Sequence, residues 1–157
     1  MISNLTDVHP DAKIAKNVKI DSFVSISGNV EIGAGTWIGP NVSIMDGARI
    51  GANCRIFPGA VVSADPQDMK YKGEETLAHI GDGTTIRECV TVNKGTAAKG
   101  ETVIGKSCLI MAYCHVAHDC ILGNHVILVN NVGLAGEVEI DDYAYLGGMV
   151  GVHQFVR

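Results

Sequence analysis

The sequence lacks a run of 18 apolar residues, and it does not begin with a basic stretch followed by an apolar one. We therefore expect neither a membrane-spanning helix nor a secretory signal peptide. It also lacks an excess of basic residues, because 12 scattered Lys and Arg stand against 17 Asp and Glu, for a net charge of −5. This balance argues against nucleic acid as a partner.

The five cysteines include no Cys-x-x-Cys pair, which argues against a redox or zinc motif of that spacing. Cys54, Cys108, Cys114 and Cys120 instead fall on a repeating register of small residues. We interpret these four as buried thiols in a reducing compartment, not as disulfide partners or metal ligands.

What the sequence does contain is an aliphatic residue at every sixth position through almost its whole length. Counting from Val8, 22 of the 25 positions so spaced are Ile, Val or Leu. The exceptions are Asp68, Glu74 and Ala98. A helix repeats every 3.6 residues and a strand every two, so neither explains a strict period of six.

A second register of small or β-branched residues lies two positions before the first, as Val18 lies before Ile20. Two inward positions two residues apart describe a short strand with one buried face, and the glycines that often follow supply a corner. The pattern predicts an all-β fold, a parallel β-helix of hexapeptide repeats in which three hexads close each 18-residue coil. Residues 18 apart should then stack about 4.8 Å apart.

We expect one domain over residues 1–157 with two interruptions. The positions six residues apart, counted from Val8, are hereafter called the lattice. In residues 63–79 polar and charged residues occupy lattice positions, and Pro66 and Gly73 break any strand. Their 17 residues approximate one coil, which would preserve the phase of the lattice. We interpret them as an external loop that carries function, and residues 95–101 as a shorter, tolerated insertion.

Four of the six histidines lie between residues 115 and 153. Val116 is an inward lattice residue, so His115 should point outward, and His118 and Asp119 should project from the next corner. A carboxylate beside an imidazole can fix its tautomer and support its protonated form, which suits a general base near neutral pH. The alternative is a set of solvated corner histidines.

The 18-residue period places further residues beside this pair. Gly136 should stack over His118, where it lets a ligand approach closely and offers its N–H to an oxyanion. Gln154 follows one coil later. Glu137 should stack over Asp119, and two neighbouring carboxylates are expected to raise the pKa of a carboxyl group.

Four segments together resemble the UDP-N-acetylglucosamine O-acyltransferases of Gram-negative bacteria: residues 66–74, 86–92, 115–120 and 147–155. The resemblance implies a left-handed coil in a cytoplasmic homotrimer with active sites between subunits. It implies transfer of a 3-hydroxylated acyl chain from the phosphopantetheine of acyl carrier protein to the 3-hydroxyl of UDP-N-acetylglucosamine. This step opens lipid A synthesis and needs no metal or other cofactor.

The resemblance also implies roles for individual residues. His118 would be the general base, Asp119 would orient it, and the N–H of Gly136 would stabilise the oxyanion. The substrate would be bound by Asp68, Lys70, His115, Glu137, His153 and Gln154. The family often has His at the position of Glu137, and its members continue into further coils and a C-terminal helical domain that this chain does not include. Those parts contact the carrier protein and set acyl length.

Other functions stay open at this point. A related hexapeptide enzyme N-acylates a UDP-sugar, and others acetylate small molecules from coenzyme A. A γ-class carbonic anhydrase has a similar scaffold and binds zinc through three histidines, for which His115, His118 and His125 are candidates. The last alternative is an inactive fragment that only assembles or binds nucleotide.

Overall fold

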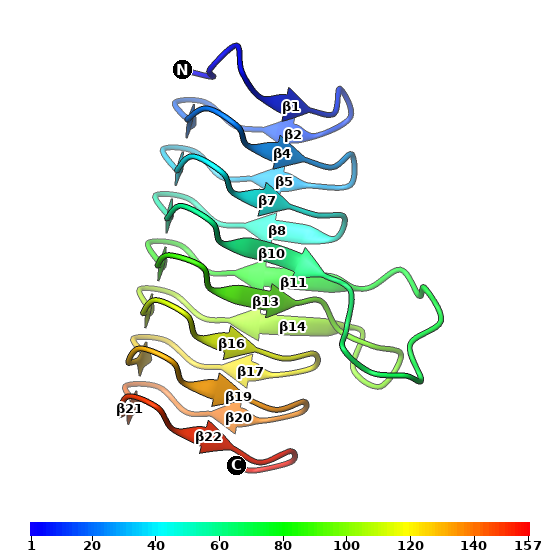
Figure 1. Ribbon diagram of the computed structural model, residues 1–157, viewed down its shortest axis with the longest axis vertical. Helices are drawn as coiled ribbons and strands as arrows, with labels where there is room; N and C mark the ends of the chain where they lie inside the picture. The colour runs from blue at the N-terminus through cyan, green and yellow to red at the C-terminus, as the bar shows by residue number, and fades with distance from the viewer.

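The computed structural model describes residues 1–157 and consists of short parallel strands wound into a three-sided coil. Figure 1 shows the coils stacked from the N-terminus at one end to the C-terminus at the other. The prediction of an all-β hexapeptide-repeat helix is confirmed, and the winding is left-handed. No helix that is long and apolar enough to span a bilayer is present.

Each side of the coil is one parallel sheet, and every third strand belongs to the same sheet. The first sheet contains β1 (Asp7–Val8), β4 (Ser25–Ile26), β7 (Ser43–Ile44), β10 (Val61–Ala64), β13 (Thr91–Asn93), β16 (His115–Val116), β19 (Gly133–Leu134) and β22 (Gly151–Val152). The second contains β2 (Lys13–Ile14), β5 (Glu31–Ile32), β8 (Ala48–Ile50), β11 (Leu77–Ile80), β14 (Glu101–Ile104), β17 (Ile121–Leu122) and β20 (Glu139–Ile140). The third contains β3 (Lys19–Ile20), β6 (Trp37–Ile38), β9 (Arg55–Ile56), β12 (Thr85–Ile86), β15 (Leu109–Ile110), β18 (Ile127–Leu128) and β21 (Tyr145–Leu146).

The registers between strands confirm the predicted winding. His115 pairs with Gly133, and Gly133 pairs with Gly151, so each lap takes 18 residues. Backbone N–H groups of one coil donate to carbonyl groups of the next, as parallel strands require. Residues at equal phase therefore stack into columns, and a corner residue is placed by its number alone.

Two coils are longer, and both carry a loop at the corner between the first and second sheets, hereafter the site corner (Figure 1). Val62 pairs with Val92, 30 residues on, and Val92 pairs with Val116, 24 residues on. Relative to an 18-residue lap these coils gain twelve and six residues. The phase survives because both insertions are multiples of six, not because the first loop approximates one coil.

The loops differ by a few residues from the predicted segments. The first loop comprises residues 65–76 instead of 63–79, and the second comprises 94–100 instead of 95–101. The difference arises because residues at the predicted edges pair with neighbouring strands, as Leu77 pairs with Glu101. In Figure 1 both loops leave the coil on the same side, and the first descends to the level of the second.

The core is one continuous hydrophobic interior that runs along the axis of the coil. A cluster of 33 buried apolar residues fills the coil, and Ile56, Ile86 and Ile110, stacked in the third sheet, are fully buried. Each such side chain stabilises the fold by about 1.5–3 kcal/mol. The four cysteines of the inward register are buried with free thiols, as predicted, whereas Cys89 is exposed.

Candidate active site

The turn between β16 and β17 brings an imidazole and a carboxylate into contact. Nδ1 of His118 lies 2.8 Å from Oδ2 of Asp119. Asp119 is fully buried and His118 is 7% exposed, so water screens this contact very little. Because Nδ1 is engaged, Nε2 is the ring atom left for a ligand. Both side chains project from the corner, as predicted, and Asp119 is then covered by the second loop.

The second loop is what covers Asp119. The Thr96 hydroxyl donates to Oδ2 at 2.6 Å, and the backbone N–H groups of Thr96 and Lys99 donate to Oδ1 at 3.0 and 3.2 Å. The N–H of Asp119 itself donates to Oγ1 of Thr102 at 2.8 Å. The interpretation of this loop as a tolerated insertion is wrong, and sequence reasoning missed Thr96, Lys99 and Thr102. The only signal was a six-residue insertion at the corner that carries His118.

These donors decide the charge state of Asp119. Burial raises its pKa, but the Thr96 hydroxyl, the His118 ring and the two backbone N–H groups outweigh burial, so the pKa lies below its ordinary value. The rise expected from a neighbouring Glu137 is therefore wrong for this carboxyl group. Glu137 occupies the next turn, where its N–H donates to the carbonyl of His118 at 3.0 Å.

Gly136 packs directly on the imidazole. A Cβ atom at this position would lie 2.5 Å from Cε1 and 2.6 Å from Nε2 of His118, closer than any side chain can come. The N–H of Gly136 donates to no acceptor within the chain. The backbone of Gly136, which carries an N–H group without an acceptor, therefore lies against the ring, and such a donor can stabilise an oxyanion.

The first loop closes a hollow of about 530 Å³ over this pair. Its lining includes residues 67–70 of the loop, with His115, His118, Ala135, Gly136 and Gln154. Oδ2 of Asp68 lies 3.9 Å from Nε2 of His118, so a carboxylate from the loop faces the free ring nitrogen. Lys70 supplies a cation to the same hollow.

Not every predicted site residue lies in this hollow. His115 does, and its Nδ1 lies 2.7 Å from Oγ1 of Thr91. Burial, and then the charge of His118, lower the pKa of His115, which favours the neutral ring. Glu137 and His153 are not in the lining of the single chain, and His153 is exposed with Nδ1 3.2 Å from the carbonyl oxygen of Gln154.

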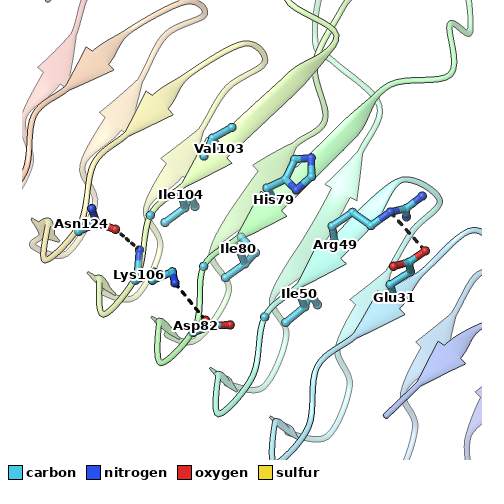
Figure 2. A pocket seen from close by; sticks show the side chains of 13 residues that line it. Glu31, Arg49, Ile50, His79, Ile80, Asp82, Val103, Ile104, Lys106 and Asn124 are labelled. Carbon is cyan, nitrogen blue, oxygen red and sulfur yellow. Dashed lines mark hydrogen bonds and ion pairs between the residues drawn. The ribbon is translucent and has the colours of Figure 1, made fainter.

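A second hollow lies on the outer face of the second sheet (Figure 2). Its charged groups pair with one another: Arg49 with Glu31 at 3.9 Å and Lys106 with Asp82 at 3.4 Å. Such solvent-exposed pairs contribute little and activate no group. The buried pair at the site corner is therefore the stronger candidate for chemistry.

Comparison with known proteins identifies relatives of this chain. The family model for bacterial transferase hexapeptide (six repeats) matches residues 29–64 and 101–136. The acyl-(acyl-carrier-protein)–UDP-N-acetylglucosamine O-acyltransferase of Pseudomonas syringae pv. tomato is 56% identical over 95 residues, 60% of this chain and 37% of that protein. The UDP-N-acetylglucosamine acyltransferase of Francisella novicida superposes on 99% of this chain, with a TM-score of 0.96 and 48% identity.

This chain belongs to the hexapeptide-repeat UDP-N-acetylglucosamine acyltransferase family. A third member, from Bacteroides fragilis, has a TM-score of 0.90 and 47% identity over 99% of this chain. The chain spans 37% of the length of the curated relative from Pseudomonas, and 57% and 66% of the Francisella and Bacteroides structures.

Proposed function

We propose that this protein transfers a 3-hydroxylated fatty acyl chain from acyl carrier protein to the 3-hydroxyl of UDP-N-acetylglucosamine. The reaction is the first step of lipid A synthesis and takes place in the cytoplasm of a Gram-negative bacterium, in a homotrimer. The observation that carries the proposal is the buried Asp119–His118 pair, whose free Nε2 faces a hollow lined by Gly136 and the first loop. Relatives that are 56% identical over 95 residues are named acyl-(acyl-carrier-protein)–UDP-N-acetylglucosamine O-acyltransferases.

His118 supplies the base. A sugar hydroxyl is a poor nucleophile until its proton is removed, and Nε2 is the ring atom free to accept it. The resulting imidazolium is stabilised by the carboxylate of Asp119, which also keeps the proton of the neutral ring on Nδ1. As the sugar oxygen bonds to the thioester carbon, charge develops on the carbonyl oxygen and the N–H of Gly136 donates to it. Loss of thiolate completes the transfer, and His118 returns the proton to the leaving sulfur.

The first loop and the neighbouring coils bind the sugar nucleotide. Lys70 pairs with the pyrophosphate as a point charge, and Asp68 accepts a hydrogen bond from the sugar. His115 and Gln154 complete the hollow in the single chain. Glu137 and His153 reach substrate from the adjoining surface of the trimer, where active sites lie between subunits.

The test is acyl transfer by the wild-type protein and by His118→Ala, with acyl carrier protein and coenzyme A thioesters and UDP-N-acetylglucosamine. Loss of a general base should reduce kcat by about 10²- to 10⁴-fold, while trimer formation and binding of the sugar nucleotide persist. The exposed His9 is the matched control, and His9→Ala should retain wild-type turnover. Undiminished turnover in His118→Ala would refute the base assignment.

The same assay separates the alternatives. Preference for a coenzyme A thioester, or for an amino-sugar acceptor, would identify a related acetyltransferase or N-acyltransferase. In the single chain His125 lies at another corner than His118, stacked on Tyr143 with ring centroids 4.8 Å apart, so the carbonic anhydrase alternative would need histidines from neighbouring subunits. Stoichiometric zinc in the purified protein would identify it. No group of three or more His, Cys, Asp or Glu side chains is arranged to hold a metal. A protein that binds the nucleotide without turnover would be the inactive assembly.

A further inference from the structure

The second loop places one side chain directly behind the catalytic pair. Thr96 is buried, its hydroxyl donates to Oδ2 of Asp119 at 2.6 Å, and its N–H donates to Oδ1 at 3.0 Å. We propose that Thr96 is a positioning residue for acyl transfer: it holds the Asp119 carboxylate in the orientation that in turn fixes the His118 imidazole. This inference rests on the proposed function.

The geometry gives Thr96 more influence than an ordinary loop residue has. Oδ2 of Asp119 accepts from both the Thr96 hydroxyl and Nδ1 of His118, so the same oxygen joins loop and base. Hydrogen bonds to a charged acceptor are about twice as strong as neutral ones, and burial of Asp119 keeps water from replacing them. A rotation of the carboxylate would therefore move the ring.

Hydrogen bonds and an ion pair hold the second loop in place, and they therefore fix the position of Thr96. The Thr96 hydroxyl accepts from the N–H of Ala98 at 3.1 Å. Oγ1 of Thr76, at the end of the first loop, donates to the carbonyl of Gly95 at 2.5 Å. Nζ of Lys99 lies 3.0 Å from Oε1 of Glu139 on β20. These contacts connect the second loop to the first loop and to the next coil.

Other charged and titratable groups lie around the His118–Asp119 pair, and the variants used in a test must leave these residues unchanged. They are Asp68 and Lys70 of the first loop, His115 on β16, Cys120 beside the turn, Lys99 of the second loop and Glu137 of the next turn. None of them donates a side-chain hydrogen bond to Asp119. Among the surrounding side chains, only Thr96 and His118 do so.

The experiment compares Thr96→Val, Thr96→Ser and Ala97→Val in the full-length protein. Valine at 96 keeps shape but removes the hydroxyl, serine restores it, and valine at the exposed Ala97 changes the loop without touching Asp119. The pH midpoint of the Asp119 carboxyl group is followed by ¹³C NMR, and kcat and KM are measured with acyl carrier protein thioester and UDP-N-acetylglucosamine.

In Thr96→Val the carboxyl midpoint should rise by roughly one to two pH units, because a charge-assisted hydrogen bond is lost. Its kcat should fall on the order of 10²-fold with little change in KM, since the base is misplaced and the substrate contacts remain. Thr96→Ser and Ala97→Val should match the wild type in both readouts. If Thr96→Val does not fold, Thr96→Ala makes the same comparison.

An unmoved carboxyl midpoint, or a kcat within twofold of wild type in Thr96→Val, overturns the positioning role. A shifted midpoint in a protein whose wild type transfers no acyl group leaves the Thr96–Asp119 link in place and removes the proposed function instead. A fall in stability with neither effect reduces Thr96 to a structural contact.

Discussion

Gly136 lies one coil beyond His118, and a Cβ atom on it would lie 2.6 Å from the Nε2 atom of that imidazole. Alanine at 136 would therefore displace the ring that we assign as the base. Gly133, on the preceding strand, has open space around its missing Cβ. Alanine would thus collide with the imidazole at Gly136, whereas it would meet no neighbouring atom at Gly133.

We expect Gly136→Ala to lower kcat on the order of 10²-fold, as a misplaced catalytic group does, while the protein stays folded. The matched control Gly133→Ala should keep both turnover and thermal midpoint. Steady-state kinetics and a melting curve for the two variants check this prediction. Full turnover in Gly136→Ala would mean that the contact with His118 does not matter for catalysis.

Asp119→Asn should reduce kcat by about 10³-fold or more with KM nearly constant. The amide is neutral, so it no longer stabilises the imidazolium, and it presents an N–H group to Thr96 or His118, which already donate to this site. The exposed Asp7 provides the control, and Asp7→Asn should behave as wild type. The comparison requires only kcat and KM for the three proteins.

The depressed pKa of Asp119 predicts a pH dependence of stability. A group whose pKa is lower in the folded state than in the unfolded state stabilises fully above its unfolded pKa. That contribution is lost as the pH falls from the ordinary carboxyl value of about 3.9 toward the folded pKa. The stability advantage of wild type over Asp119→Asn, measured by urea unfolding, should shrink as the pH falls below about 5. An advantage that grows between about pH 5 and pH 3 would reverse the assigned direction.

The thiols should differ sharply in reactivity. Burial raises the pKa of Cys120 to about 11, and Cys54, Cys108 and Cys114 are also buried with raised pKa values, because burial disfavours the thiolate. Cys89 is exposed. A thiol reagent should modify one cysteine in the folded protein and five after denaturation, and Cys89→Ser should remove the fast reaction. Rapid modification of two or more thiols in the native protein would contradict the buried register.

The fold was predictable from the sequence to the level of individual contacts. The six-residue period of aliphatic residues identified the core. The 18-residue spacing, which is three such periods and one coil, identified stacked neighbours such as His115 and Gly133. The same arithmetic placed Gly136 over His118. Prediction succeeded here because every coil must bury its side chains in the same way, so the same residue pattern recurs in each coil.

The site was predictable only where it follows that lattice. The contact of Asp68 with the base and the cover that Thr96 forms over Asp119 arise in the loops, which lie outside the repeat. The expectation of a raised carboxyl pKa was wrong for the same reason, because it counted Glu137 and omitted donors from a loop of unknown path.

The sequence by itself determined the coil, its 18-residue lap and the column in which His118 and Gly136 meet, because an aliphatic residue at every sixth position buries the same phase in every coil. Tertiary structure alone decided which side chains reach that column from the loops. Inserted residues are bound by no period, and their path is set by individual hydrogen bonds such as the one from Thr96 to Asp119.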